Sequence, residues 1–302
     1  MADAPAHAMS RRTIHGDGLQ LAVWEGPRNG PTVLFVHGYP DTHVVWDRVV
    51  ERLAGDFHCV VYDVRGAGES GVPADRAGYR LAHLRADLAA VLAAVASSEQ
   101  VHLVGHDWGS LQAWDAVVRA DGEPALSGRF ASYTTISGPC LDHVSAWTSA
   151  AWRGGWQRKR GALRQLRHSW YVFAFQVPVL PELVLRRVNR RLLERRQHGT
   201  YHFADTLPED AARGVNLYRA NILARRPEVP GGPYTFLPVQ LLVPVRDAYV
   251  TPEFYRDLHR YVADLSRVDL DAGHWAPHTH AEEVARLVAT FVHDHGKGLT
   301  GG

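Results

Sequence analysis

An aspartate occupies the centre of a Gly-x-Asp-x-Gly pattern in the segment VHLVGHDWGS, residues 101–110. Gly105 and Gly109 flank Asp107, the residues before it are typical of a buried strand, and a helical pattern begins at Leu111. Such a strand-to-helix turn lifts one side chain clear of a sheet, and its tightness requires small neighbours. A hydroxyl at that position would attack acyl carbons. A carboxylate instead suits attack at an sp³ carbon, as in an epoxide or an alkyl halide.

Two further residues could complete a catalytic set with Asp107. His274 lies in the sequence Asp-Ala-Gly-His-Trp directly after a predicted strand, and Asp247 ends another. Because open α/β sheets gather their sites at the carboxyl ends of strands, we expect these side chains to lie close together. We predict His274 as the base and Asp247 as the carboxylate that orients its imidazole. Asp142, which follows the predicted strand at 131–138, is the alternative orienting residue.

A third feature is the turn His-Gly-Tyr-Pro at residues 37–40, which closes a predicted strand. A tight turn there can aim a backbone N–H at the nucleophile. His37 either shapes this turn or contacts the substrate, and both roles stay open. Trp275, which directly follows the predicted base, is a further candidate for substrate contact.

The elements that must position these residues alternate between strand and helix. Short β-branched runs ending in glycine or aspartate are typical of buried parallel strands, and a hairpin is expected around residues 16–18. Helical stripes separate the runs, for example at residues 81–97. The predicted strands are residues 31–38, 58–66, 101–107, 131–138, 239–247 and 266–274.

The alternation stops between residues 141 and 235, where the chain is helix-like and rich in tryptophan. Strand–helix alternation favours a mostly parallel sheet flanked by helices. We therefore predict an α/β core domain made of residues 1–140 and 236–302. The helical segment 141–235 is predicted to form a cap (lid) domain inserted in that core.

Composition narrows the function classes. The 302 residues carry a net charge of +1, which gives no sign of nucleic acid as a partner, and no run reaches the roughly 18 apolar residues of a membrane-spanning helix. The basic excess within the cap is interpreted as a solvated helical face. Two cysteines and a first segment without an apolar run favour the cytoplasm. The abundance of arginine and alanine over lysine indicates a GC-rich bacterial source. Neither a metal nor a cofactor is expected, and a homodimer is an open prediction.

Five motifs together carry a family resemblance: HGYP, YDVRGAGES, GHDWGS, VRDAYV and GHW. In this combination and order the chain resembles the α/β-hydrolase fold, and within it the soluble bacterial epoxide hydrolases. The resemblance spans about residues 14–295, nearly the whole chain, and the order nucleophile, acid, base is that of the family. It implies an apolar epoxide as the small-molecule substrate.

The cap contains two segments that resemble the family's tyrosine-bearing segments. HSWYVFAFQVPVLPEL, residues 168–183, places Tyr171 before a Phe-Gln-x-Pro stretch, and VNLYRANI, residues 215–222, places Tyr218. The resemblance implies that both phenols hydrogen-bond the epoxide oxygen and donate a proton as the ring opens, since phenols stay protonated at neutral pH. Trp170, adjacent to the first tyrosine, is the alternative donor and a candidate substrate contact.

The resemblance further implies a covalent mechanism. Asp107 would form an alkyl ester, which water activated by His274 would then hydrolyse, and the product would be a vicinal diol. The backbone N–H groups of Tyr39 and Trp108 would stabilise the oxyanion.

Rival functions fit the residues less well. A serine esterase is disfavoured because Asp107 occupies the nucleophile position and Ser110 lies beyond the turn. A haloalkane dehalogenase shares the Asp-His-acid arrangement and a tryptophan after the nucleophile, but its pattern has a halide-binding asparagine where this chain has Tyr39, and it leaves the cap tyrosines unexplained. A haloacid dehalogenase needs arginines where this chain has Trp108 and Leu111. A non-catalytic small-molecule-binding protein on the same fold predicts the loss of His274 or Asp247, and both are present.

Aromatic residues in the cap bear on the substrate. Because a cap must pack on the main domain, most of them are expected in the hydrophobic core. An aromatic-lined pocket would favour a bulky, apolar or polycyclic epoxide, with a role in bacterial secondary metabolism or lipid-epoxide handling as a further hypothesis. The aromatic residues concerned are Trp147, Trp152, Trp156, Trp170, Phe173, Phe175 and Phe203.

Overall fold

The computed structural model describes residues 9–187, 202–223 and 232–296. The prediction that the chain begins without a targeting segment falls partly on residues 1–8, outside the described residues.

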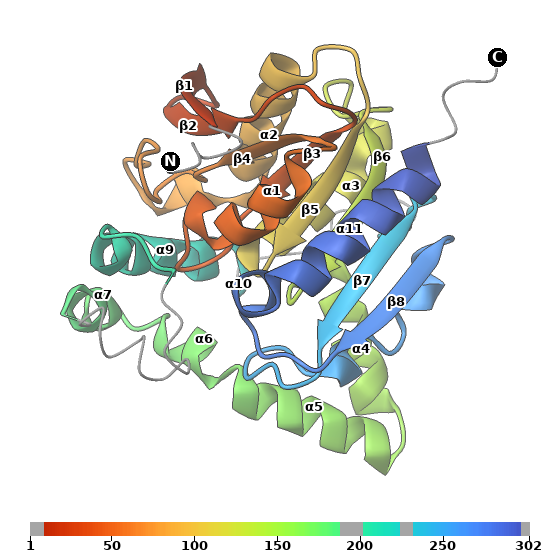
Figure 1. The fold of residues 1–302 in the computed structure, drawn as a ribbon. Helices are drawn as coiled ribbons and strands as arrows, with labels where there is room; N and C mark the ends of the chain where they lie inside the picture. Colours follow the sequence, from red (N-terminus) through yellow and green to blue (C-terminus); the bar gives the residue numbers. More distant parts are fainter. Residues whose placement is uncertain (1–8, 188–201, 224–231, 297–302) are drawn as a thin grey trace.

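One eight-stranded sheet organises the molecule, in the order β1-β2-β4-β3-β5-β6-β7-β8 (Figure 1). The pairs β1–β2 and β2–β4 are antiparallel, and the five remaining pairs are parallel. The sheet thus confirms the predicted mostly parallel α/β fold and the hairpin at its start. The strands are β1 (Ser10–His15), β2 (Gln20–Glu25), β3 (Thr32–Val36), β4 (His58–Tyr62), β5 (Val101–His106), β6 (Phe130–Ile136), β7 (Val239–Pro244) and β8 (Leu265–Leu270).

The central strands are hydrophobic on both faces because helices cover both. Every residue of β3, β4 and β5 is buried. In β3, Leu34 and Val36 pack toward one layer, whereas Val33 and Phe35 pack toward the other, as the alternation of side chains along a strand requires. Continuous apolar strands of this kind belong to sheets covered on both sides.

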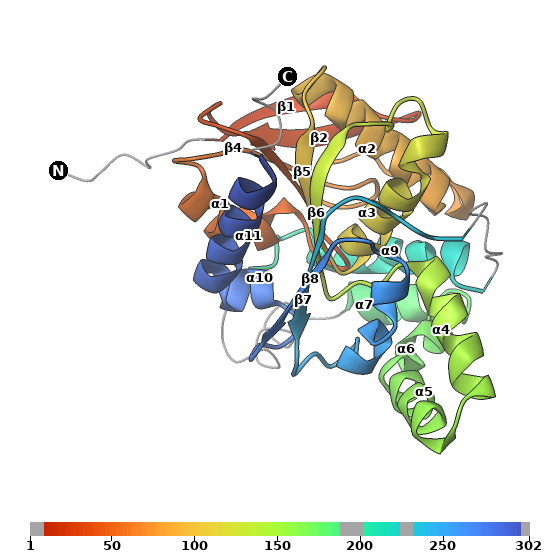
Figure 2. The same ribbon diagram turned by 90° about the vertical axis from the view of Figure 1, so that its right-hand side faces the viewer.

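Helices α2 (Leu81–Val95) and α3 (Trp108–Arg119) cover one face, and α1 (Asp47–Leu53) and α11 (Ala281–Gly296) cover the other (Figure 2). The short helix α10 (Ala276–Thr279) precedes α11. Single-turn 3₁₀ helices complete the core, at His43–Trp46, Arg76–Tyr79, Ala120–Gly122, Pro252–Tyr255 and Leu258–Arg260.

The described residues between β6 and β7 are mainly helical and lie beyond the carboxyl edge of the sheet (Figure 1). Its place in the chain is that of the predicted cap, and we use that name for it below. Its described helices are α4 (Leu141–Arg153), α5 (Trp156–His168), α6 (Trp170–Ala174), α7 (Leu180–Arg186) and α9 (Leu207–Asn221).

The helix after β5 starts earlier than the sequence predicts, at Trp108 instead of Leu111. The reason lies in its first hydrogen bond, which runs from the Leu111 N–H to the carbonyl of Asp107 at 3.0 Å. The helix therefore begins directly after the turn residue Asp107.

Candidate active site

Asp107 sits on a strained turn between β5 and α3. Its backbone has φ 51° and ψ −121°, which few non-glycine residues adopt. The turn is tight because α3 crosses close behind β3: a Cβ on Gly109 would lie 2.1 Å from the Val36 carbonyl oxygen. This explains the glycine of the motif, and it holds the carboxylate out at the sheet edge.

The turn after β3 supplies one backbone donor to that carboxylate. The Tyr39 N–H donates to Oδ1 of Asp107 at 2.7 Å. The approach requires Gly38, where a Cβ would lie 2.6 Å from the same oxygen. Within the described residues, no hydrogen bond joins the Trp108 N–H to the carboxylate. The Trp108 side chain is buried, its ring 5.0 Å from that of Tyr218.

His274 lies between two carboxylates. Its Nδ1 donates to Oδ2 of Asp247 at 2.9 Å, and its Nε2 lies 3.5 Å from Oδ2 of Asp107. Asp247 is itself fixed, because its Oδ1 accepts from the backbone N–H groups of Tyr249 and Val250 at 2.7 and 3.1 Å. The structure thus brings the predicted nucleophile, base and orienting acid together.

The charge environment of His274 follows from this geometry. Burial alone would lower its pKa, but the carboxylates of Asp247 and Asp107 outweigh burial and raise the pKa from 6.5 to about 10. Burial likewise opposes ionisation of Asp247, yet its pKa is lowered because the imidazolium lies against it. The two carboxylates therefore favour the protonated form of His274.

Asp142, the alternative orienting residue, lies elsewhere. It stands in the first turn of α4, and its Oδ2 lies 3.5 Å from the guanidinium of Arg119. Asp247, and not Asp142, therefore contacts the imidazole of His274.

His106 contributes in a way that the sequence did not indicate. Its Nε2 donates to the backbone carbonyl of His274 at 2.9 Å, and the two rings lie 4.9 Å apart. Burial and the neighbouring His274 lower the pKa of His106 to about 4, so this imidazole is neutral. It fixes the loop that carries the predicted base. Its position directly before Asp107 was the one signal in the sequence.

Three phenols gather above the carboxylate. The rings of Tyr171 and Tyr218 lie 5.7 Å apart, and the ring of Tyr249 lies 5.5 Å from Tyr171 and 4.7 Å from His274. Burial, together with the Asp107 carboxylate and neighbouring phenols, raises the pKa of both cap tyrosines. Tyr249 escaped the sequence analysis, although it lies in the VRDAYV motif that supplied Asp247.

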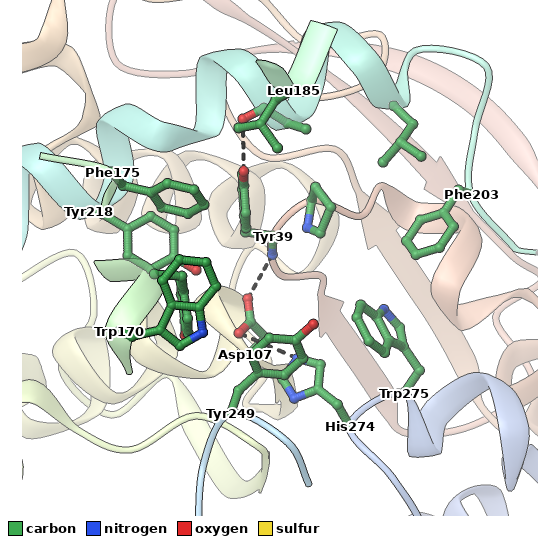
Figure 3. A pocket seen from close by; sticks show the side chains of 14 residues that line it. Tyr39, Asp107, Trp170, Phe175, Leu185, Phe203, Tyr218, Tyr249, His274 and Trp275 are labelled. Atoms are coloured by element: carbon green, nitrogen blue, oxygen red, sulfur yellow. Dashed lines mark hydrogen bonds and ion pairs between the residues drawn. The ribbon is translucent and has the colours of Figure 1, made fainter. Parts of the chain in front are cut away.

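Two cavities meet at this cluster. Chamber one has a volume of about 270 Å³ and chamber two about 260 Å³, and Asp107, Tyr171, Tyr218 and Tyr249 line both. Figure 3 shows the first chamber, with Tyr39 and Tyr218 on the cap side of Asp107. The rest of chamber one is formed by Tyr39, Pro40, Trp170, Phe175, Leu185, Phe203, Leu207, Ala211, His274 and Trp275. Among the described residues that line either chamber, Asp107 and His274 are the only charged ones.

Of the three residues predicted to contact the substrate, two line chamber one and the third does not. Trp170 and Trp275 line chamber one. His37 does not: it is fully buried, its Nδ1 donates to the Gly38 carbonyl, and its Nε2 accepts from the Val64 N–H. Both ring nitrogens are therefore used in shaping the turn, and the position of His37 does not support a substrate contact.

A buried hydrogen bond ties the cap to the core beside chamber one. His202, from the cap, lies 2.9 Å from Oδ1 of Asp41, and the indole N–H of Trp275 donates to Oδ2 of the same carboxylate at 3.1 Å. Asp41 thus contacts both a cap residue and Trp275, which lines chamber one. Burial opposes its ionisation, but His202 keeps the pKa of Asp41 below its ordinary value.

No three His, Cys, Asp or Glu side chains in the described ranges are grouped so that they could hold a metal ion. None of the described helices is long and apolar enough to cross a membrane.

A protein-family model and several known proteins match this chain. Residues 31–281 match the family model of the alpha/beta hydrolase fold. The chain is 38% identical over 297 residues to the "Probable oxidoreductase EphD" of Mycobacterium tuberculosis, covering 94% of this chain and 49% of that protein. It is 26% identical over 301 residues to "Epoxide hydrolase 3" of Mus musculus, covering 93% and 76% respectively. The chain thus spans about half the length of the mycobacterial relatives.

Solved structures show the same fold. An epoxide hydrolase of Bacillus megaterium in complex with an inhibitor superposes with a TM-score of 0.76 at 22% identity, covering 93% of this chain and all of that one. A structure described as one of the novel epoxide hydrolases from metagenomes of hot environments superposes with a TM-score of 0.73 at 23% identity, covering 94% of this chain and 99% of that one.

Proposed function

This chain belongs to the alpha/beta hydrolase fold family, and on that premise we propose that it opens an apolar epoxide to a vicinal diol through a covalent ester on Asp107. The observation that carries the proposal is the placement of a carboxylate, not a hydroxyl, on the strained turn, with phenols on one side and a carboxylate-bound imidazole on the other.

In the first step an oxygen of Asp107 attacks an epoxide carbon. The ring carbon–oxygen bond breaks, and the ring oxygen takes a proton from Tyr171 or Tyr218. Their raised pKa keeps both phenols protonated, so that a donor is present throughout the neutral range. The Tyr39 N–H fixes the other carboxylate oxygen and so orients the attacking one.

In the second step water attacks the ester carbonyl. Once Asp107 is an ester its charge is gone, and one of the two anions that raise the pKa of His274 is removed. The imidazolium then gives up its proton, and the phenolate left by ring opening takes one back through solvent. The neutral imidazole accepts a proton from the attacking water, with Asp247 stabilising the new cation. The Tyr39 N–H faces the developing oxyanion. The ester bond to the substrate breaks, the diol leaves, and the carboxylate is restored.

The two chambers bear on the substrate. Asp107 lines both, and most of the other described lining residues are apolar or aromatic, with Ser137, Thr148, Gln165 and Ser169 as uncharged polar residues of chamber two. An epoxide with an apolar group on each ring carbon would place one group in each chamber. We therefore propose bulky 1,2-disubstituted epoxides, aromatic or aliphatic, as the preferred substrates.

A panel of aromatic and aliphatic epoxides tests this function, assayed for diol formation beside a panel of haloalkanes assayed for halide release. The expected result is diol from the wild type, no activity in Asp107→Asn, and faster turnover of disubstituted than of terminal epoxides. Asparagine is the matched variant because it keeps the shape of the side chain and tolerates positive φ. Halide release without diol formation would instead favour the dehalogenase. Neither diol nor halide, with ligand binding retained, would favour a binding protein.

A further inference from the structure

The large apolar side chains of the cap helix α5 face the solvent, and its buried side includes a polar residue. Its buried residues are Ala162 and Gln165, whereas Trp156, Leu163 and Leu166 are exposed. A surface helix ordinarily turns its apolar stripe toward the core. The sequence predicted most of the cap tryptophans in the core, and this prediction is wrong for three of the four: Trp152, Trp156 and Trp170 are 51%, 70% and 67% exposed.

Polar contacts hold the inner face of α5. Gln165 accepts from the backbone N–H and the hydroxyl of Thr251 at 2.9 Å each, and donates to the Tyr249 carbonyl at 2.7 Å. His168 bonds the carbonyl of Ala248, and Arg158 pairs with Asp257. The loop after β7 thus anchors the helix by hydrogen bonds, which explains how its apolar side is left facing outward.

The exposed apolar residues form one stripe. They recur at spacings of three, four or seven residues along α5 and the following α6, with Trp152 just before them at the end of α4. We call the set the apolar cap face: Trp152, Trp156, Leu163, Leu166, Trp170 and Phe173. An exposed apolar stripe of this extent on a folded domain marks a surface that binds something apolar.

The segment that carries this face is basic, although Glu253 pairs with Arg164 and Asp257 with Arg158. Residues 143–181 contain six lysines and arginines and no aspartate or glutamate. Arg160 and Arg167 are exposed on α5, and neither has an ion pair within the part of the chain that the structure describes. A helix that joins exposed Trp and Leu to unpaired arginines has the composition of segments that lie in the interface of an anionic membrane.

The apolar cap face also borders both chambers. Trp170 lines chamber one, and Trp152, Leu166 and Phe173 line chamber two. Half-exposed side chains that also line a cavity make the surface and the cavity continuous. The route into each chamber therefore passes the apolar cap face.

We propose that the apolar cap face docks on the surface of an anionic lipid bilayer. A second copy of the chain fits less well, because a symmetric pair would bring the same basic face against itself. A rigid protein partner would cover the rims of both chambers. A fluid apolar phase leaves them open and dissolves the apolar substrates argued above. This last point, delivery of substrate from the lipid, rests on the proposed function, whereas the docking itself does not.

The test measures binding of the full chain to vesicles by flotation. Vesicles of phosphatidylcholine with phosphatidylglycerol are compared with vesicles of phosphatidylcholine alone. Two double variants probe the face: Trp156→Ser with Leu163→Ser, and Arg160→Glu with Arg167→Glu. None of these residues lines a chamber. The control is Phe236→Ser, since Phe236 is 77% exposed, precedes the amino end of β7 and is not part of the apolar cap face.

The wild type is expected to float with the anionic vesicles, to bind the neutral ones far less, and to be released by salt. Each double variant should lower the partition coefficient at least about tenfold, with the control unchanged. Absence of wild-type binding, or equal binding by the variants, would overturn the proposal. Self-association of the wild type that both double variants abolish would also overturn it, in favour of a second copy. Because flotation needs no turnover, vesicle binding by a chain that hydrolyses no epoxide would refute the proposed function alone.

Discussion

The Nε2 of His274 lies 3.5 Å from Oδ2 of Asp107, while the other nitrogen of the same ring is bonded to Asp247. One imidazole thus faces both the nucleophile and the acid of the site. The charge on Asp107 raises the pKa of His274, so formation of an ester on Asp107 changes the protonation of the base. This relationship separates the two halves of the proposed reaction and makes each half testable.

Replacing His274 should stop the reaction halfway. In His274→Gln the carboxylate of Asp107 can still attack, but no base activates water, so the covalent ester should accumulate. Mass spectrometry of the intact protein after mixing with an epoxide should show a mass increase equal to the whole epoxide, and peptide mapping should place it on Asp107. Diol formation should fall by about 10² to 10⁴-fold.

The mass increase also separates the two reaction classes. An epoxide keeps its oxygen on ring opening, whereas a haloalkane loses its halide and adds only the alkyl group. The double variant Asp107→Asn with His274→Gln is the matched control and should stay unmodified. A label on any residue other than Asp107 would contradict the assigned nucleophile.

Stability should depend on pH through His274. Its pKa in the folded protein, about 10, lies above the ordinary 6.5, so protonation stabilises the folded state. This contribution is fully present below about pH 6.5 and is lost as the pH rises toward 10. The difference in unfolding free energy between the wild type and His274→Gln should shrink over that range, by at most about 1.4 kcal/mol per pH unit. Urea titrations at pH 6, 8 and 10 measure it, and a difference that grows with pH would contradict the geometry.

The two cap phenols should act in ring opening only. We expect Tyr171→Phe and Tyr218→Phe each to slow formation of the covalent ester by about tenfold or more, and the double variant to slow it by about 10² to 10⁴-fold. Single-turnover mixing, with the ester trapped by acid, measures that step separately from ester hydrolysis. Tyr249→Phe is the matched comparison, because its ring lies in the same cluster but packs on His274. If the cap variants slowed ester hydrolysis and left ester formation unchanged, the assignment of Tyr171 and Tyr218 to ring opening would be wrong.

The sequence predicted the sheet well because its strands are uniform. Residues buried on both faces leave continuous β-branched runs, and the turn at Asp107 has a glycine requirement that the structure explains through the approach of Gly109 to β3. The predicted strands at 131–138 and 266–274 correspond to β6 and β8, which each begin one residue earlier and end earlier, at Ile136 and Leu270. The mostly parallel α/β fold is thus confirmed, whereas the catalytic roles stay predictions.

What the sequence did not predict depends on contacts between distant segments. Tyr249 and His106 acquire their places only through the approach of the loops after β5, β7 and β8. The orientation of α5 was also hidden, because a stripe of Trp and Leu in a sequence looks the same whether it faces the core or the solvent. The polar contacts of Gln165, His168 and Arg158 with the loop after β7 hold the inner side of the helix.

The two chambers predict different responses to filling. Leu185→Trp narrows chamber one, and Val172→Trp narrows chamber two, at positions that are only partly buried. A 1,2-disubstituted epoxide needs both chambers, so either variant should lower its kcat/KM at least about tenfold. A terminal epoxide carries one group and can use the open chamber, so each single variant should change its kcat/KM by less than about threefold. Equal losses for both substrates would show that the chambers do not accept the two groups separately.

The contact between Asp41 and His202 should hold the cap on the core. Removing the imidazole in His202→Ala leaves a buried carboxylate with the Trp275 indole as its remaining hydrogen-bond donor within the described residues, and breaking one side of a buried pair costs about 3 to 5 kcal/mol. The double variant Asp41→Asn with His202→Ala removes the charge as well and should recover part of that loss. Urea unfolding measures both. Because Trp275 lines chamber one, His202→Ala should also raise KM more than it lowers kcat. A stability loss in the double variant as large as in the single one would show that packing, and not the buried charge, makes this contact.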